Sequence, residues 1–315
     1  MTLPQGAPRK PKALRKGSKV AVFAPASPAE QLDVTAGLAE LRRLGYEFTP
    51  VQFPGSEGYF AGSTAYRLDA FIKAARHPEI AGLFALRGGY GATYLLDHNP
   101  SAQLQEPKCV IGFSDLTSLQ IYLWQKCGWV TFHGPMVTAG LNRGADDSHG
   151  YDEDSFIQAV ANPNSGWEIA LAGKPLTRGV AEGGLLGGCL TLLQTTLGTP
   201  WELDTTDAIL VLEDRGMRPY QIDRALMHLK QAGKFQHVQA IILGEFPDSE
   251  PLTKGSPSVR EVCERILLPL NIPIIFGAAI GHTKRPMLTL PLGVKARLFS
   301  SGDGRLEILE PAVVK

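Results

Sequence analysis

Short apolar runs that alternate with amphipathic stretches constrain this chain more than any other feature of its sequence. Runs such as 19–24, 82–86 and 108–113 have the length of buried strands. The stretches 29–44 and 116–126 have the apolar spacing of helices. Strands that alternate with helices form mostly parallel sheets whose two faces are covered. We therefore predict an α/β fold, beginning with a mostly parallel sheet flanked by helices.

The alternation weakens between about residues 142 and 177, where Gly, Asp, Asn, Pro and Ser are frequent. This composition is typical of a junction between domains. The pattern then resumes, with strands predicted at 208–212, 239–243 and 273–276 and a helix at 222–231. Residues 287–310 are typical of β-hairpins, with a turn at 301–304.

These patterns predict two domains. The first is a Rossmann-like N-terminal α/β domain, and the second is a C-terminal α/β domain with β-hairpins. The predicted boundaries are 1–145 for the N-terminal domain, 146–177 for the junction and 178–315 for the C-terminal domain.

Composition argues against several classes of function. Lys plus Arg and Asp plus Glu number 31 each, so no global field holds the chain on nucleic acid or on an anionic membrane. The four cysteines form no Cys-x-x-Cys pair and no His-Glu-x-x-His occurs, which disfavours a disulfide framework, a zinc ribbon and a zinc peptidase. The first 17 residues hold five basic residues and no apolar signal stretch. We expect a solvated tail, a cytoplasmic protein, no cofactor or metal, and no nucleic-acid or membrane partner.

Ser114 is the candidate nucleophile because of the turn in which it stands. A buried run leads into Gly112, Phe113 and Ser114, and a predicted helix follows. A small residue two places before the serine allows a tight strand-to-helix turn that exposes the hydroxyl at the carboxyl end of the sheet. The same turn aims the backbone N–H of Asp115 towards the place where an oxyanion would form. An ordinary helix cap made by the Ser-Asp pair is the alternative.

A serine hydroxyl needs a base to become nucleophilic at neutral pH. Among the seven histidines, His133 and His282 lie in loops that follow apolar runs, where α/β sheets keep their chemistry. His282 is the better candidate because its apolar run precedes it directly. Glu213 ends another apolar run and is the candidate carboxylate that would fix the tautomer of the histidine. A surface ion pair between Glu213 and a nearby arginine is the alternative.

With these segments in hand, the chain resembles the L,D-carboxypeptidases, a family of serine peptidases that includes muramoyltetrapeptide carboxypeptidase and the microcin-immunity-type amidases. The similarity extends over nearly the whole chain. Its motifs occur in one order, at 17–28, 87–91, 112–115, 132–136, 212–214, 220–224, 244–246, 281–282 and 288–293.

The resemblance implies a Ser–His–Glu triad in an active site at the interface between the two domains. The matching positions are Ser114 as nucleophile, His282 as general base and acid, and Glu213 as the residue that orients it. The resemblance also implies an oxyanion hole built from the backbone N–H groups of Asp115 and Gly89.

Substrate recognition is predicted less directly. A leaving D-amino acid would carry a free carboxylate, so a nearby cation is expected, and Arg87 beside the glycine-rich loop is the candidate. A strand-end salt bridge is the alternative for this arginine. The family's Gly-Gly-Asn-Leu segment reads Gly187-Gly188-Cys189-Leu190 here, and a thiol cannot make the hydrogen bonds of an amide. The glycines of 183–188 lack a phosphate-loop pattern, so we expect a tight turn near the site.

The function implied by the resemblance is hydrolysis of the L,D amide bond that releases the C-terminal D-alanine of a murein tetrapeptide in cell-wall recycling. An acyl-enzyme would form on Ser114, and the resemblance favours a homodimer. One alternative is a microcin-immunity-type amidase that cleaves peptidyl- or aminoacyl-nucleotides. Such an enzyme would need an aromatic residue to stack on the base, and four tryptophans are available: Trp124, Trp129, Trp167 and Trp201. The other alternative is a non-enzymatic two-domain binding protein.

Overall fold

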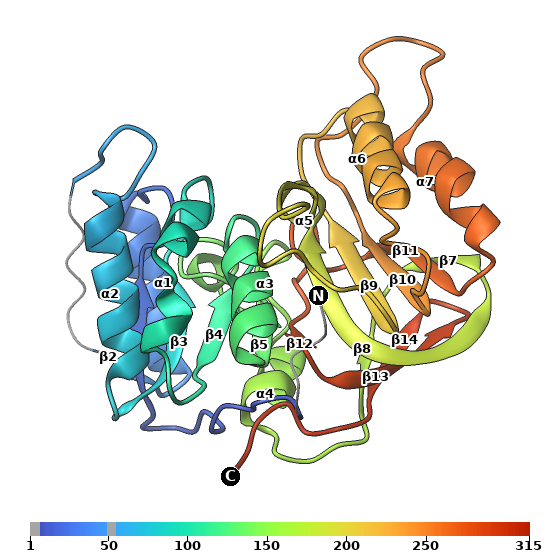
Figure 1. Cartoon of the computed structure of the whole chain (residues 1–315). Helices are drawn as coiled ribbons and strands as arrows, with labels where there is room; N and C mark the ends of the chain where they lie inside the picture. Colours follow the sequence, from blue (N-terminus) through green and yellow to red (C-terminus); the bar gives the residue numbers. More distant parts are fainter. Residues whose placement is uncertain (1–6, 49–54) are drawn as a thin grey trace.

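The computed structural model describes residues 7–48 and 55–315, which form two sheets with helices against them. Figure 1 shows the sheets side by side, the first built mainly from the N-terminal half of the chain and the second from the C-terminal half. The predicted α/β class is confirmed.

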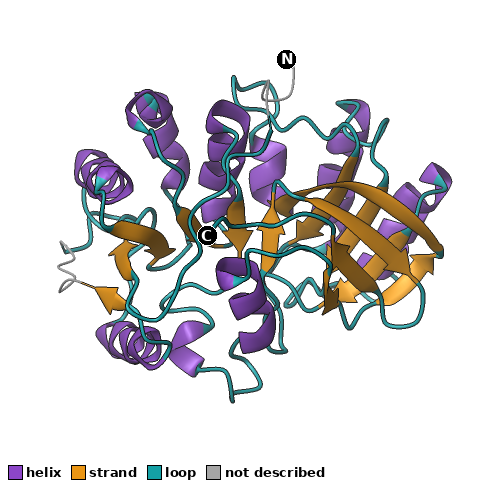
Figure 2. Ribbon diagram, turned by 90° about the horizontal axis from the view of Figure 1, so that it is seen from below, coloured by secondary structure: helices purple, strands orange, loops and turns teal. Residues whose placement is uncertain are grey.

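The first sheet has the strand order β12-β5-β4-β3-β1-β2. All its pairs are parallel except the one between β12 and β5. Helices lie on both of its faces (Figure 2), which is why its central strands are apolar along their whole length. Its strands are β1 (Lys19–Phe23), β2 (Glu47–Phe48), β3 (Ile80–Ala85), β4 (Cys109–Gly112), β5 (Thr131–His133) and β12 (Leu290–Leu292). The helical segments of this half are α1 (Gln31–Arg43), α2 (Thr64–Arg76), η1 (Ala92–His98), η2 (Pro100–Gln103), α3 (Leu116–Cys127), η3 (Leu141–Arg143) and α4 (Glu153–Ala161).

The second sheet has the order β6-β14-β13-β8-β9-β10-β11-β7. Its centre, from β8 to β11, is parallel and its two flanks are antiparallel. Its strands are β6 (Trp167–Ala170), β7 (Lys174–Thr177), β8 (Gly179–Cys189), β9 (Ala208–Glu213), β10 (Ala240–Gly244), β11 (Ile274–Ala278), β13 (Lys295–Ser300) and β14 (Arg305–Ile308). The helices are α5 (Leu190–Thr195), α6 (Pro219–Gln231), α7 (Val259–Leu267) and the short η4 (Leu268–Leu270).

Local sequence signals set several helix ends. The Ser63 side chain accepts a hydrogen bond from the backbone N–H of Tyr66 at the start of α2, and Asp152 does the same for Ser155 at the start of α4. Gly128 ends α3 in the left-handed conformation, at φ +65°. α3 therefore has a fixed length between the end of β4 and the start of β5.

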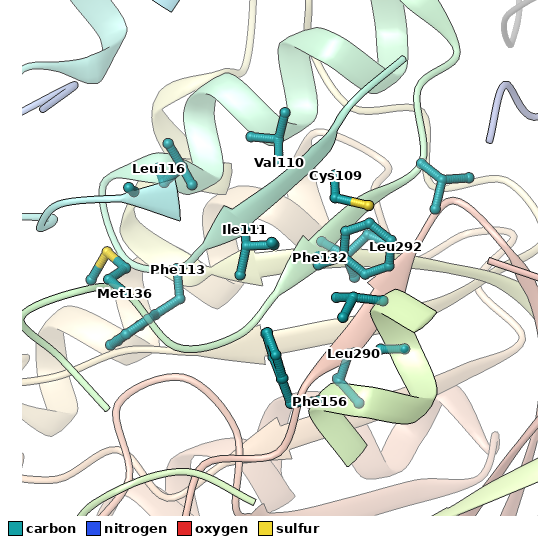
Figure 3. Close-up of a cluster of buried hydrophobic side chains, with 14 of the residues drawn as sticks. Cys109, Val110, Ile111, Phe113, Leu116, Phe132, Met136, Phe156, Leu290 and Leu292 are labelled. Atoms are coloured by element: carbon teal, nitrogen blue, oxygen red, sulfur yellow. The ribbon is translucent and has the colours of Figure 1, made fainter. Parts of the chain in front are cut away.

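The C-terminal segment differs from the prediction of successive hairpins. β13 and β14 do form a hairpin around 301–304. β12 instead crosses to the first sheet and pairs antiparallel with β5. Figure 3 shows its Leu290 and Leu292 packed near Phe132 and Phe156. Burial of these apolar side chains at an otherwise unpaired strand edge favours the crossing over a local hairpin.

The predicted junction, residues 146–177, contains regular structure. It holds α4 and the strands β6 and β7, which form the two edges of the second sheet. Their partners β14 and β11 lie far along the chain, so the local composition gave no sign of pairing. The domain boundaries themselves stay a prediction.

Two further expectations were wrong. Residues 9–14 are not a solvated tail: Ala13 and Leu14 are buried, and the backbone of this segment bonds to Gly128 and Val314. The glycines of 183–188 lie within strand β8 rather than in a turn. They are needed for close approach to β9, because a Cβ on Gly187 would lie 2.1 Å from the carbonyl oxygen of Val211.

Candidate active site

Ser114 stands in a strained turn between β4 and α3. Its φ is +61°, in the left-handed region that side chains other than glycine rarely adopt. Gly112 has a φ of +155°, and a Cβ there would lie 2.5 Å from Cδ2 of Leu116 and 3.1 Å from Cβ of Ala85, so another residue at the start of this turn would be strained. The N-cap of α3 is Asp115, whose side chain makes no cap hydrogen bond. The helix-cap alternative is therefore wrong, and the turn presents the Ser114 hydroxyl at the carboxyl end of the sheet.

His282 and Glu213 meet at the carboxyl end of the second sheet. Glu213 is the last residue of β9, and His282 follows β11. The Nδ1 atom of His282 lies 2.7 Å from Oε2 of Glu213, and the His282 backbone N–H donates to the same oxygen at 2.9 Å. The Glu213 side chain is fully buried and the His282 side chain is 17 % exposed. The surface-pair alternative for Glu213 is therefore wrong.

Two glycines make room for this pair. A Cβ on Gly281 would lie 2.3 Å from the carboxyl carbon of Glu213, and the φ of Gly281 is +55°. A Cβ on Gly244 would lie 2.7 Å from the Cβ of Glu213. The backbone of Gly281 and Gly244 thus packs against the Glu213 side chain at distances that leave no room for a Cβ atom.

The electrostatics of the pair favour a charged glutamate. Burial by itself raises the pKa of Glu213, but His282 outweighs burial by its charge and its hydrogen bond, so the pKa of Glu213 lies below its usual value. Burial likewise lowers the pKa of His282, and the Glu213 carboxylate reverses this, so the pKa of His282 is raised. Such a histidine is a stronger base than a free imidazole.

One pocket of about 440 Å³ contains both Ser114 and His282. The N-terminal half contributes the loop of Arg87, Gly88 and Gly89 to its wall, and the C-terminal half contributes Arg215. No hydrogen bond joins the Ser114 hydroxyl to the His282 ring within the described residues. Contacts of this kind often tighten only when substrate binds.

The glycine-rich loop lies directly over the serine. A Cβ on Gly88 would lie 3.0 Å from Oγ of Ser114 and 3.4 Å from the backbone N of Asp115. Gly89, at φ +99°, backs onto Ser27, whose Oγ would be 2.4 Å from an added Cβ. The sequence patterns point to Gly89 and give no sign of its neighbour Gly88. The oxyanion roles of Asp115 and Gly89 stay predictions.

Buried polar groups hold this loop against the nucleophile helix. The Asp115 carboxylate accepts a hydrogen bond from the backbone N–H of Ala92 at 2.7 Å. Burial raises the pKa of Asp115 to about 6. The fully buried Arg67 donates to the carbonyl oxygens of Pro25 at 2.5 Å and Gly91 at 2.7 Å. The C-terminal end of the loop is therefore held by two buried side chains, Asp115 and Arg67.

Two arginines reach the pocket. The Nη1 atom of Arg87 donates to the carbonyl oxygen of Pro28 at 2.7 Å, and Arg87 forms no salt bridge within the described part of the chain. Arg215 pairs through Nε with Asp248 at 2.8 Å. The sequence offers the arginines near Glu213 only as surface partners of that carboxylate, whereas Arg215, which follows the end of β9, lines the pocket. Arg87 as the group that binds the substrate stays a prediction.

Cys189 occupies the place where the resemblance leads one to expect asparagine. Its Sγ lies 3.4 Å from Oδ2 of Asp214, and its backbone N–H donates to Oγ1 of Thr117 at 3.1 Å. This second contact joins β8 to α3, the helix behind Ser114. Burial raises the pKa of the thiol well above its usual value, so Cys189 has none of the character of a nucleophile.

The described residues give no sign of tryptophan stacking at the pocket, of a metal site or of a membrane span. Trp129 and Trp167 are buried, and no tryptophan lines the Ser114 pocket in the ranges 7–48 and 55–315. Over the same ranges, no three His, Cys, Asp or Glu side chains gather as a metal site requires. No helix among these residues has the length and apolarity needed to cross a bilayer.

Comparison with known proteins identifies the family of this chain. The LD-carboxypeptidase N-terminal domain matches residues 20–134, and the LD-carboxypeptidase C-terminal domain matches residues 182–298. The chain belongs to the LD-carboxypeptidase family. It is accordingly a hydrolase of the carboxypeptidase type, which confirms the predicted resemblance and goes against a non-enzymatic binding protein.

Individual relatives agree with this assignment. The chain is 35 % identical over 295 residues to a probable murein peptide carboxypeptidase of Bacillus subtilis, covering 92 % of this chain and 91 % of that protein. A crystal structure of muramoyltetrapeptide carboxypeptidase from Oxalobacter formigenes superposes with a TM-score of 0.81 at 28 % identity, covering 94 % of this chain and all of that one. The microcin C7 self immunity protein MccF, in complex with aspartyl sulfamoyl adenosine, superposes with a TM-score of 0.87 at 25 % identity, covering 97 % of this chain and all of that one.

Proposed function

We propose that this LD-carboxypeptidase family member hydrolyses the amide bond between an L-centre and the C-terminal D-alanine of murein tetrapeptides. The observation that carries the proposal is the buried Glu213–His282 pair, which shares one pocket with Ser114 in its left-handed turn. Relatives named for murein peptides supply the substrate class.

The first half of the reaction forms an acyl-enzyme. Ser114 Oγ attacks the carbonyl carbon of the scissile amide, and its proton passes to Nε2 of His282. Glu213 holds Nδ1 of His282 and stabilises the imidazolium that forms. The backbone N–H groups of Asp115 and Gly89 donate to the oxyanion, and each such donor contributes about 100-fold or more in turnover.

The second half releases both products. His282 gives its proton to the nitrogen of the departing D-alanine, and the C–N bond breaks. A water molecule then loses a proton to His282 and attacks the ester carbon. The bond between that carbon and Oγ of Ser114 breaks, His282 returns the proton to Oγ, and the shortened peptide leaves. The carboxylate of the leaving D-alanine needs a cation, and Arg87 and Arg215 both line the pocket.

The decisive experiment is mass spectrometry of a murein tetrapeptide incubated with the protein. We expect loss of one alanine from the wild type. We expect Ser114→Ala to fold and to lose at least about 1000-fold in rate, because removing the nucleophile leaves only oxyanion stabilisation and binding. Tetrapeptides with diaminopimelate or lysine at the third position, used in parallel, define the preferred substrate.

An aminoacyl sulfamoyl adenylate in the same assay tests the microcin-immunity-type alternative. Cleavage of this compound alone, with the tetrapeptide left intact, would overturn the proposal. The lining of the described pocket includes Phe113 but no tryptophan, so the assay and not the aromatic content of the pocket decides between the two substrates.

We further propose that the protein acts in the cytoplasm as a homodimer. The sequence resemblance supports the dimer. The balanced charge of the chain provides no attraction to anionic membranes, which supports the cytoplasm. Light scattering of the purified protein and fractionation of the source cells test these two points. A monomer at working concentration, or recovery with the membrane fraction, would contradict them.

A further inference from the structure

A second histidine faces the side of Glu213 that His282 does not use. His133, the last residue of β5, is fully buried, and its Nε2 atom lies 3.7 Å from Oε1 of Glu213. His282 takes both of its contacts from the other oxygen, Oε2. The carboxylate of Glu213 is thus held between two imidazole rings.

Buried polar atoms of Glu213 and His133 lack hydrogen-bond partners. Within the described residues, Oε1 of Glu213 and both ring nitrogens of His133 are buried and have no hydrogen-bond partner. A buried carboxylate oxygen without a donor costs free energy, and buried polar groups in proteins are nearly always paired. A closure of about 0.5 Å or more would bring the two atoms, now 3.7 Å apart, within hydrogen-bond distance.

We propose that His133 is a positioning residue, whose Nε2–H donates to Oε1 of Glu213 and fixes the plane of the carboxylate so that Oε2 meets Nδ1 of His282. The inference rests on the proposed triad and adds a member to it. His133 does not line the Ser114 pocket, so it acts through Glu213 and not on the substrate.

The charge state of His133 suits this role. Burial lowers the pKa of His133, and the nearby His282 lowers it further, while Glu213 raises it without reversing the shift. A neutral imidazole carries one proton, and with that proton on Nε2 the ring is a donor towards Glu213. The other ionisable groups that face the pair are Asp214 and Arg215 after β9 and Cys189 at the end of β8.

The fold holds His133 rigidly in this place. β5 lies between β4 and β12, with His133 opposite Gly112 on one side and Leu290 on the other. The ring of Phe113 packs edge-on against both histidines, with centroid distances of 6.1 Å to His133 and 5.0 Å to His282. Because Glu213 belongs to the second sheet, the contact aligns the triad across the interface between the two halves.

Three substitutions separate a hydrogen-bonding role from a packing role. The amide nitrogen of glutamine can occupy the position of Nε2 of histidine, whereas that of asparagine matches Nδ1. Phenylalanine keeps the ring and removes the donor. We therefore expect His133→Gln to keep the rate within about threefold, and His133→Asn and His133→Phe to lose 10- to 100-fold in kcat with little change in KM.

Two readouts keep this test independent of the peptide substrate. The first is the rate at which a fluorophosphonate labels Ser114. The second is the low-field proton resonance of the His282 Nδ1–H in the resting protein, which reports its hydrogen bond to Glu213. We expect this resonance to persist in His133→Gln and to shift upfield in His133→Asn and His133→Phe. The exposed His98→Phe is the control and should leave both readouts unchanged.

The possible outcomes are distinct. Equal losses in the Gln and Asn variants at unchanged thermal stability would overturn the inference, as would a wild-type resonance and rate in His133→Phe. If His133→Phe fails to fold, the comparison of Gln with Asn decides the question. A tetrapeptide left intact by the wild type would refute the proposed substrate, and the resonance would still report on His133.

Discussion

Among single residues, Glu213 has the largest influence on the candidate site. It is a fully buried carboxylate whose two oxygens face different histidines. Its ionised form is held by the His282 hydrogen bonds, and in turn it raises the pKa of His282. The basicity of His282 is therefore a joint property of His282 and Glu213.

Replacement of Glu213 by glutamine should change the pH dependence of activity. His282 must be neutral to accept the serine proton, so wild-type kcat/KM should fall as the pH drops below the raised pKa of His282. In Glu213→Gln burial dominates, the pKa of His282 falls, and the acid limb of the profile moves to lower pH. We also expect a loss of roughly 10³ to 10⁴ in kcat, because the amide no longer enforces the correct tautomer. The exposed-surface variant Glu106→Gln is the control. An unmoved acid limb in Glu213→Gln would contradict the prediction.

Asp115 should make stability depend on pH in the opposite sense to an ordinary salt bridge. Burial raises its pKa from 3.8 to about 6 in the folded protein. The folded state is therefore favoured below pH 4, and this advantage is lost as the pH rises through 6, by roughly 2 to 4 kcal/mol. Asp115→Asn keeps an acceptor for Ala92 and cannot ionise, so its urea midpoint should vary less than that of the wild type between pH 4 and 7. The same dependence of the urea midpoint on pH in both proteins would refute this prediction.

Among the structural elements, the turn between β4 and α3 and the loop after β3 form one unit. Gly112 permits the turn, and Gly88 lets the loop come within contact distance of the Ser114 hydroxyl. At both positions the absence of a Cβ atom allows a close contact that another residue would prevent.

A methyl group on Gly88 should impair catalysis more than folding. Its Cβ would lie 2.9 Å from Cβ and 3.0 Å from Oγ of Ser114, while the backbone of Gly88 is not in the left-handed region. Displacement of the serine should lower kcat/KM about 100-fold or more, with a stability loss of about 1 to 3 kcal/mol from overpacking. Gly184→Ala is the matched control, because its Cβ would meet nothing within 4 Å. Equal activity of the two variants would show that the loop moves away freely.

The sequence predicts the elements that carry their own signal and misses those defined by distant partners. Ser114, Glu213 and His282 each follow an apolar run, so the meeting of their strand ends was accessible from the pattern. The place of His133 was not, because its burial comes from β12 and Glu213, both far along the chain. The same holds for β6 and β7, whose four-residue strands are stable only against β14 and β11.

The whole molecule is held together across the interface by β12. This strand comes from the C-terminal part of the chain and completes the first sheet. The backbone of Val314 also bonds to Pro11 and Ala13, and Cys189 bonds to Thr117. Among the described residues, the two halves therefore share hydrogen bonds at several separate places.

We expect the two halves to unfold together. Leu290→Ala removes a fully buried side chain from β12 and should lower the free energy of unfolding by about 2 to 5 kcal/mol. The far-UV circular dichroism and tryptophan fluorescence midpoints in urea should stay coincident in both proteins. Leu252→Ala, at a side chain that is 77 % exposed, is the control. Two separated transitions in the wild type would contradict this coupling.

The late position of β12 also has a consequence for synthesis on the ribosome. When β1 to β5 have emerged, the edge of β5 has no neighbour until residues 290–292 have been translated. The nascent chain thus carries an open strand edge through more than 150 further residues, and an open strand edge favours association with other chains. In the proposed mechanism the N-terminal part alone would be inactive, because Ser114 is translated long before Glu213 and His282. In the proposed mechanism, hydrolytic competence would then arise only after residues 290–292 have been translated.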